Sequence, residues 1–364
     1  MSPASASLAS LVLLLPLFGV LLLAPGGGAG PVEPSGDPPV DSLGPAPRDA
    51  DGLFVNPAGP LSHGSLGVRL PFFARRLAGF FQSREGIPGR VGNDGAFLRE
   101  NARHSEPTLT WIGHSTLLVQ MDHATFLTDP IWSDRPSPLS FLGPRRFVPP
   151  GLALEDLPPI DFVLISHNHY DHLDLPTLRE LAARDPNTRF VVPLGNGDLL
   201  RGEGIERVSE LDWGGSIRHG EVRIDCLPAQ HWSKRGLGDD REALWASWAV
   251  SGRERRFYFA GDTGYFGGFE RIGEILGPFD LVAMPIGAYE PVRMMQASHV
   301  NPEEAVRAAL DLRARRVVAM HFGTFDLSDE PLAEPPRRFR AAAESSRFGA
   351  DEAWVLEIGE TRLF

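Results

Sequence analysis

The chain has 364 residues, 42% of them hydrophobic, and a formal net charge of −12 from 35 basic and 47 acidic residues. The hydrophobic fraction is ordinary for a globular protein and is sufficient for a large core. The acidic balance, with no basic stripe in the sequence, excludes a nucleic-acid surface. Cys226 is the only cysteine, which excludes an intrachain disulfide and a zinc site built from thiolates.

Residues 1–30 contain an almost continuous apolar run from Leu8 to Ala24. The run predicts either a secretory signal peptide, with the small residues after it as the cleavage region, or a membrane anchor, which needs about 17–25 apolar residues. No Lys or Arg precedes the run, although both kinds of segment normally have one. Export is favoured over anchoring, so we expect a periplasmic, extracellular or membrane-anchored protein. Residues 31–52 are rich in Gly, Pro and Ser and predict a flexible linker.

Residues 53–364 remain for one folded domain, and an amphipathic segment lies near its start. Leu70 to Phe81 carries aromatic residues and arginines at helical spacing. The pattern is typical of a helix packed on the domain. The alternative is a membrane-facing helix with its arginines at the level of the lipid headgroups.

Short apolar strands and helices alternate through the rest of the chain. The sequence predicts helices at 175–183, from Asn301 onward and at 336–348, where Pro lies near each start. Strands are predicted at 109–112, 115–121, 125–128, 162–165, 189–193, 222–227, 244–250, 256–260, 281–284, 316–320 and 354–358. Such a mixture indicates an α/β sandwich rather than an all-β one.

Four side chains of metal-ligand type follow the strand at 162–165 within six residues. They have the spacing His-x-His-x-Asp-His and are His167, His169, Asp171 and His172. Imidazole and carboxylate are the ligands that zinc takes when no thiolate is offered. Because alternate residues of a loop can turn toward one point, we expect the first two histidines to bind one ion and the other two residues to bind a second.

The missing ligands come after other strands. His231, Asp262 and His321 each follow a short apolar strand directly, as His167 does. The first ion would then have His167, His169 and His231, and the second would have Asp171, His172 and His321. Asp262 would lie between the two ions and bridge them. The sequence therefore predicts a site for two zinc ions at one rim of packed sheets, with open positions for catalysis. His114 is expected to lie beside the site as a hydrogen-bonded histidine.

These residues resemble the metallo-β-lactamase superfamily, which implies a four-layer αββα sandwich with a dinuclear metal site. Within it, the chain is similar to the N-acyl-phosphatidylethanolamine-hydrolysing phospholipase D family. The resemblance spans about Phe54 to Phe339 and is carried by Trp111–Ser115, Leu127–Pro130, Gly143–Phe147, Ile165–Asp174, Gln230–Trp232, Phe259–Tyr265, Pro285–Pro291, His299–Ala305 and His321–Phe325.

The resemblance implies hydrolysis of the phosphodiester in an N-acyl-phosphatidylethanolamine, giving phosphatidic acid and an N-acylethanolamine. It assigns the seven metal ligands above, an attacking hydroxide oriented by Asp171, and His299 as the histidine beside the substrate phosphate. It also implies association with a membrane surface and leaves a homodimer open. The chain departs from the family at Phe322, where Trp is usual, and at Val292–Met295, where Arg-Trp-Phe-Met is usual. Both positions lie near the acyl groove of that family, so acyl preference is not carried over.

Three alternatives remain. The first is a lactonase or small-molecule phosphodiesterase on the same scaffold, because the fold does not fix the substrate. The second is a redox di-iron protein, although that variant typically has a Glu in the motif where this chain has His169-Tyr170-Asp171. The third is a non-catalytic binding module, which the complete ligand set disfavours.

Overall fold

The computed structural model describes residues 43–62, 64–78, 85–349 and 351–364. The predicted signal peptide or anchor at 1–30 and residues 31–42 of the predicted linker lie outside the described residues. The last part of that linker, 43–52, lies against the domain. Ala46 is buried, and its amide donates a hydrogen bond to Asp212. None of the helices in the described ranges is long and apolar enough to span a bilayer.

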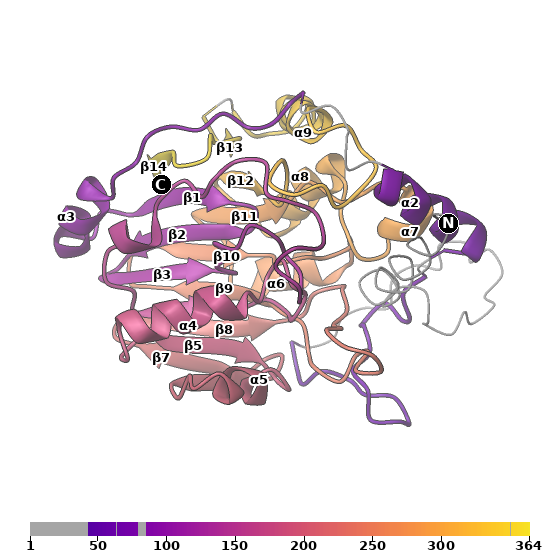
Figure 1. Cartoon of the computed structure of the whole chain (residues 1–364). Coiled ribbons are helices and arrows are strands. Elements are labelled where there is room, and N and C mark those ends of the chain that lie inside the picture. The colour runs from indigo at the N-terminus through magenta and orange to yellow at the C-terminus, as the bar shows by residue number, and fades with distance from the viewer. Residues whose placement is uncertain (1–42, 63, 79–84, 350) are drawn as a thin grey trace, which may run out of the picture.

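The described residues form two seven-stranded mixed sheets that pack face to face (Figure 1). The first sheet has the order β14 (Thr361–Leu363), β1 (Thr108–Gly113), β2 (Thr116–Met121), β3 (Ala124–Thr128), β4 (Phe162–Leu164), β5 (Arg189–Pro193) and β6 (Val208–Leu211). The second has the order β13 (Ala353–Trp354), β12 (Val317–Met320), β11 (Leu281–Pro285), β10 (Arg256–Phe259), β9 (Ser247–Ser251), β8 (Val222–Leu227) and β7 (Ser216–His219).

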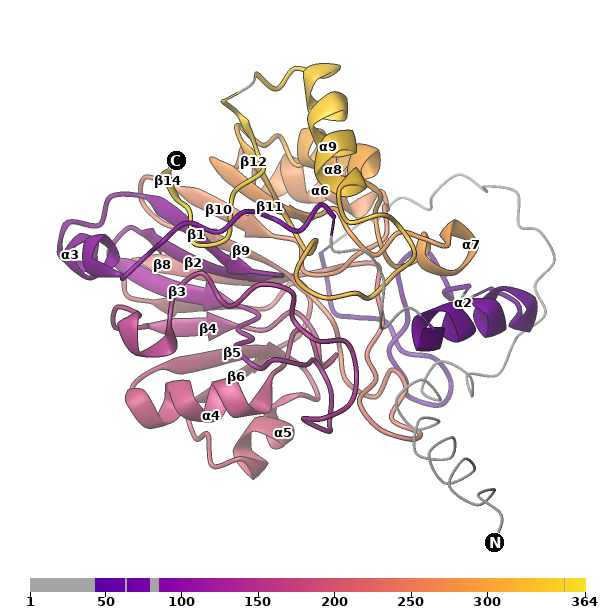
Figure 2. The same ribbon diagram turned by 45° about the horizontal axis from the view of Figure 1, so that its top comes forward.

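Helices cover the outer faces of the sheets, which confirms the predicted α/β sandwich (Figure 2). One outer layer contains α4 (Leu175–Arg184) and α5 (Gly197–Gly202), and the other contains α6 (Gly268–Ile275), α8 (Pro302–Asp311) and α9 (Glu334–Glu344). The remaining helices are α2 (Leu66–Ala78), α3 (Ala96–His104), α7 (Val292–Met295) and the 3-10 helix η2 (Leu154–Asp156). Asn301 caps α8 through a capping box with Glu304, as expected from Pro302 at the first helical position.

The inner strands are buried on both sides because helices or loops cover the outer face of each sheet and the other sheet covers the inner face. All residues of β1, β2, β3, β4 and β11 are buried. The main core lies between the sheets, where the ring of Phe126 stacks on Phe162 with centroids 4.7 Å apart. A second apolar cluster, which includes Leu178 and Leu181, seats α4 on the first sheet.

Strand direction explains why polar side chains gather at one rim. In the first sheet β1, β3 and β4 run in the same direction, because β2 is antiparallel to β1 and β3 and β4 is parallel to β3. In the second sheet β8, β10 and β12 likewise share one direction. Residues that follow these strands therefore emerge together, at the end that faces α2 and α7 in Figure 1.

Two strand predictions differ from the structure. The strand predicted at 244–250 begins only at Ser247, since the amides of Leu244 and Ala246 bond to Leu194 and Ser166 of the other half of the sandwich. The strand predicted at 354–358 ends at Trp354. Ile358 instead bonds to residues 89 and 91, and the chain then crosses to the first sheet as β14.

The predicted amphipathic helix is present as α2, although residues 79–81 of the predicted range lie outside the described residues. Phe72 and Phe73 of α2 are buried in a small cluster with Met294 of α7. The packed-helix interpretation therefore holds for this face. Leu66 and Leu70, on α2, and Val292, on α7, are about half exposed.

Candidate metal centre

The structure brings the predicted ligands together at the shared rim. The loop after β4 carries His167, His169, Asp171 and His172, while His231, Asp262 and His321 follow β8, β10 and β12. His172 and His231 have no exposed surface, and the others are buried or half-buried. Four overlapping clusters of potential ligand atoms form among the described residues, each with its atoms within 4.8 Å of one another. Two of them contain the predicted ligand sets, which we call the first group (His167, His169 and His231) and the second group (Asp171, His172 and His321, with His114 in the same cluster). The other two clusters join Asp129 to His167 and His172, and Asp262 to His231 and His299.

The first group consists of three imidazole nitrogens. Nδ1 of His169 lies 2.8 Å from Nε2 of His167 and 3.3 Å from Nε2 of His231. Three imidazole nitrogens this close together cannot all form hydrogen bonds with one another, because a neutral imidazole has a single N–H. Zinc–nitrogen bonds of about 2.0–2.1 Å in a tetrahedron separate ligand atoms by about 3.3 Å. The spacing therefore fits a cation.

The second group combines carboxylates and imidazoles. Oδ2 of Asp171 lies 3.4 Å from Nε2 of His172 and 3.6 Å from Nε2 of His321. Oδ2 of Asp262 lies 3.2 and 3.1 Å from the same two nitrogens and 4.0 Å from Nε2 of His231. Asp262 thus lies between the two groups, where the sequence placed it.

Unpartnered buried atoms also fit a metal. Nε2 of His172, Nε2 of His321 and Oδ1 of Asp262 are enclosed and make no hydrogen bond within the described part of the chain. The short distances to Asp262 Oδ2 are therefore close approaches without hydrogen-bond geometry. A buried polar atom without a partner is destabilising by about 1–3 kcal/mol, so a cation that takes these lone pairs would stabilise the site.

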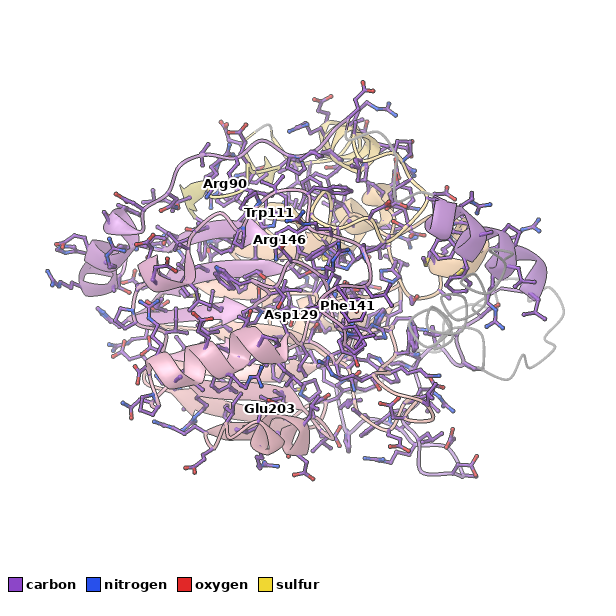
Figure 3. The ribbon with its side chains drawn as sticks, viewed as in Figure 1. Arg90, Trp111, Asp129, Phe141, Arg146 and Glu203 are labelled. Carbon is purple, nitrogen blue, oxygen red and sulfur yellow. The ribbon has the colours of Figure 1, made fainter. Side chains whose placement is uncertain are left out.

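Hydrogen bonds behind the two groups fix the rings. Asp129, which is labelled in Figure 3, lies just beyond the end of β3. It accepts a hydrogen bond from Nδ1 of His172 at 2.6 Å. It also accepts from the amide and hydroxyl of Ser166, both at 2.6 Å. The Ser166 hydroxyl oxygen lies 2.8 Å from Nδ1 of His167. One buried carboxylate thus orients a histidine of each group, which is a common arrangement behind metal ligands.

His231 is held by the backbone. Its Nδ1 lies 3.0 Å from the carbonyl oxygen of Ser298, which fixes the tautomer with Nε2 facing the first group. Its amide donates to Oδ1 of Asn56 at 3.0 Å.

The predicted hydrogen bond of His114 is present, and its partner is Asp171. Nε2 of His114 lies 3.1 Å from Asp171 Oδ2. The His114 ring is buried, and its centroid lies 4.2 Å from that of His321. Burial lowers the pKa of His114 to about 3, so the ring is neutral near pH 7 and carries one proton for this bond.

His299 lies at the edge of both groups. Its Nδ1 is 3.8 Å from Asp262 Oδ2, and its ring centroid is 5.1 Å from that of His231. Nδ1 is enclosed and makes no hydrogen bond to a described residue. The structure therefore places His299 beside the predicted ligands.

Burial and charge act differently on the two groups. Burial lowers the pKa of His169 and of His299 to about 4 and lowers the pKa of His167 and of His231 well below the usual range. The first group is therefore neutral and ready to accept a cation at pH 7.

In the second group the carboxylates prevail over burial. Although burial opposes protonation, Asp262 and Asp171 raise the pKa of His321 to about 9, and together with Asp129 they raise the pKa of His172 well above its usual range. In return His172 lowers the pKa of Asp171 and of Asp262 well below the usual range, against the effect of burial. In the metal-free chain His172 and His321 therefore carry protons at positions where a metal would bind.

The backbone is strained where these residues leave their strands. His114, Asp129 and His321 have φ values of +52°, +36° and +58°, a region that non-glycine residues rarely adopt. Gly261, which precedes Asp262, has φ +59°, and a Cβ atom there would lie 2.5 Å from Cβ of Ser166.

Sequence reasoning missed the role of Asp129. Asp129 directly follows the strand predicted at 125–128, and no function was assigned to it. The signal was the rule that identified the other ligands, since Asp129 also follows a short apolar strand directly. The tight contact with Ser166 and His172 depends on the parallel pairing of β3 and β4.

Comparisons with known proteins identify relatives of this chain. Residues 124–322, more than half of the chain, match the family model described as the beta-lactamase superfamily domain. N-acyl-phosphatidylethanolamine-hydrolyzing phospholipase D 1 of Caenorhabditis elegans is 44% identical over 271 residues, which cover 71% of this chain and 76% of that protein. The mitochondrial protein of that activity from Saccharomyces cerevisiae is 35% identical over 70% of this chain and 55% of its own length.

A solved structure shows the same fold. Igni18, a metallo hydrolase of Ignicoccus hospitalis, superimposes with a TM-score of 0.54 at 24% identity, over 71% of this chain and 98% of that chain. The sandwich, the two ligand groups at its rim and the matched relatives lead to one assignment. This chain belongs to the metallo-β-lactamase superfamily and is a metal-dependent hydrolase that resembles N-acyl-phosphatidylethanolamine-hydrolysing phospholipase D.

Proposed function

We propose that this protein is a zinc-dependent phosphodiesterase of phospholipase D type. Its substrate would be an N-acyl-phosphatidylethanolamine, and its products would be an N-acylethanolamine and phosphatidic acid. The observation that carries the proposal is the pair of ligand groups joined by Asp262, in a chain 44% identical to a protein named for that reaction.

The residues would hold two zinc ions. One would bind His167, His169 and His231, the other would bind Asp171, His172 and His321, and Asp262 would contact both. Zinc in such a pair increases the acidity of water and neutralises charge on the phosphoryl oxygens.

Asp171 would orient the attacking water. His114 engages its Oδ2, which limits the rotation of the carboxylate and leaves Oδ1 for another partner. Burial raises the pKa of Asp171, but His172 and its other partners lower it well below the usual range. The carboxylate therefore stays ionised and can accept a hydrogen bond from water.

His299 would assist at the phosphate. With its pKa lowered by burial to about 4, the ring is neutral at pH 7. The neutral ring can therefore donate a hydrogen bond to the phosphoryl group or to the leaving oxygen, but it carries no additional proton before the reaction.

We also propose that the enzyme works at a membrane surface, outside the cytoplasm or attached through its N-terminal segment. A bilayer-borne substrate and the apolar run from Leu8 to Ala24 support this. We also propose that the chain forms a homodimer, which a measurement of its molecular mass in detergent would test.

The test uses the purified full chain in detergent, loaded with zinc. It is incubated with vesicles that contain N-acyl-phosphatidylethanolamine, and products are identified by mass spectrometry. Parallel reactions contain bis(p-nitrophenyl) phosphate or a lactone. We expect phosphatidic acid and N-acylethanolamine from the native chain and neither from Asp262→Asn. Turnover of the lactone alone, or of the small diester alone, would replace the proposal with the corresponding alternative.

A further inference from the structure

Lys234 is the only lysine in the chain. Of the 35 Lys and Arg residues, 34 are arginines. Arg and Lys are not equivalent, because Arg presents a flat fork of donors whereas Lys presents a compact charge with three donors. A chain that uses Arg at every other basic position yet has Lys here points to a local requirement for the smaller cation.

The side chain of Lys234 is nearly buried and has no partner among the described residues. It is 6% exposed, and no hydrogen bond or ion pair joins it to any residue in the described ranges. Its nitrogen is not among the fully enclosed unpartnered atoms, so the ammonium reaches an opening. By contrast the buried Arg146 donates to the carbonyl oxygens of Ile131 and Ser133.

An ammonium in this setting calls for an anion. Removing a charge from most of its water is unfavourable unless an opposite charge or good hydrogen bonds replace the water. Since the described protein groups supply neither, a bound anion is the natural counter-charge.

Lys234 comes three residues after the predicted ligand His231. The ring of Trp232 packs edge-on against His169 with centroids 4.5 Å apart.

On the other side of Lys234, the guanidinium of Arg235 donates to the carbonyl oxygens of Asn168 and Leu173, both at 2.9 Å. It also stacks over Tyr170, 4.0 Å from the ring centroid. The segment that contains Lys234 is therefore attached on both sides to the loop that carries His169, Asp171 and His172.

We propose that the Lys234 ammonium binds an oxyanion of the substrate's phosphate group at the margin of the metal centre. This inference rests on the proposed phosphodiesterase function, and it assigns Lys234 as a substrate-binding residue. A compact ammonium can approach a phosphate already crowded by histidines, whereas the larger guanidinium would need a flat face.

The first experiment measures phosphate binding. Inorganic phosphate is titrated by calorimetry into the zinc-loaded full chain and into Lys234→Met, which keeps the length of the side chain without its charge. We expect binding to weaken about 10-fold or more, the range for loss of a charge-assisted hydrogen bond, with the zinc content unchanged. Glycerol 3-phosphate and N-acyl-phosphatidylethanolamine vesicles distinguish a free phosphate site from a lipid headgroup site.

Two further variants separate substrate binding from a structural role. Lys234→Arg should recover part of the affinity, because it restores charge with the wrong shape. Arg235→Met, next to it, should lower the melting temperature with much less effect on phosphate affinity. Equal phosphate affinity in native protein and Lys234→Met, or loss of zinc from Lys234→Met, overturns the proposal.

A spectroscopic measurement covers the case in which Lys234→Met does not fold. Because Lys234 is the only lysine, reductive methylation with ¹³C-formaldehyde gives one dimethyl-lysine NMR signal beside that of the terminal amine. We expect this signal to shift on saturation with inorganic phosphate and to stay in place with glycerol. A signal that does not respond, or a lysine that the small reagent cannot reach, overturns the proposal.

The two proposals fail in different ways. If the native chain leaves N-acyl-phosphatidylethanolamine intact but binds phosphate through Lys234, the lipid substrate is wrong and the anion site stands. If the native chain hydrolyses the lipid and Lys234→Met has an unchanged KM for it, the lipid function stands and the role of Lys234 falls.

Discussion

Nδ1 of His172 lies 2.6 Å from Oδ2 of Asp129, and neither side chain has any exposed surface. Asp129 directly follows β3, and His172 lies in the loop after β4, which is parallel to β3. The bond orients Nε2 of His172 toward Asp171 and Asp262. Through Ser166 the same carboxylate reaches His167, so one residue supports both ligand groups.

Replacing Asp129 with Asn should weaken both groups. An amide has one acceptor oxygen for three donors, and its NH₂ would face Ser166 or His172. We expect metal affinity or activity to fall about 10–100-fold, as for other partners of metal-bound histidines. Zinc content after dialysis and kcat/KM measure the effect. Asp198→Asn, a change at a side chain that is 99% exposed, is the control and should leave both unchanged.

Replacing His114 with Phe should change catalysis more than metal content. The ring volume is kept, but the hydrogen bond to Asp171 is lost, so the carboxylate orients water less well. We expect kcat to fall about 10-fold, within the range that positioning effects span, with KM and zinc content close to those of the native chain. If zinc is lost instead, His114 acts as a ligand.

Metal binding should depend on pH differently at the two groups. His169, with a pKa of about 4, is neutral above pH 5, whereas His321, with a pKa of about 9 in the metal-free chain, is protonated at neutral pH. A proton competes with the metal for the same lone pair. The affinity of the second group for the metal should therefore rise as pH increases toward 9, whereas the first group should already have its full affinity at pH 6.

Calorimetric zinc titrations of the metal-free protein at pH 6 and pH 8 check this difference. At pH 6 we expect two sites with different zinc affinities, and at pH 8 the two affinities should be closer to each other. Proton release, measured in buffers of different ionisation enthalpy, should accompany filling of the second group. Identical titrations at both pH values would contradict the assignment of protons to His172 and His321.

Replacing Gly261 with Ala should destabilise the site next to Asp262. The left-handed backbone is unfavourable for alanine by about 1–2 kcal/mol, and the added Cβ would lie 2.5 Å from Cβ of Ser166. We expect a lower melting temperature together with reduced zinc content. Gly220→Ala is the matched control, because Gly220 also has positive φ, +54°, but has nothing within 4 Å of the added Cβ. Gly220→Ala should lower the melting temperature through backbone strain alone and should retain its zinc.

The sequence by itself determined the ligand types and their order along the chain. Most of the short apolar runs become buried strands, and a polar residue directly after such a strand emerges at a rim. This was enough to group His167, His231, Asp262 and His321. The strands predicted at 115–121 and 125–128 are joined by a turn at Asp122 and His123, whose φ values of +46° and +61° are typical of a tight turn between two twisted strands.

Only the tertiary structure decided which side chains meet. Strand pairing between β3 and β4, residues 34 or more apart in the chain, sets Asp129 behind His172, and local pattern does not encode that register. The same holds for Lys234, whose isolation from any described counter-charge is a property of packing. Local periodicity fixes where a chain turns from apolar to polar, but distances between distant segments arise only when both sheets close over a shared core.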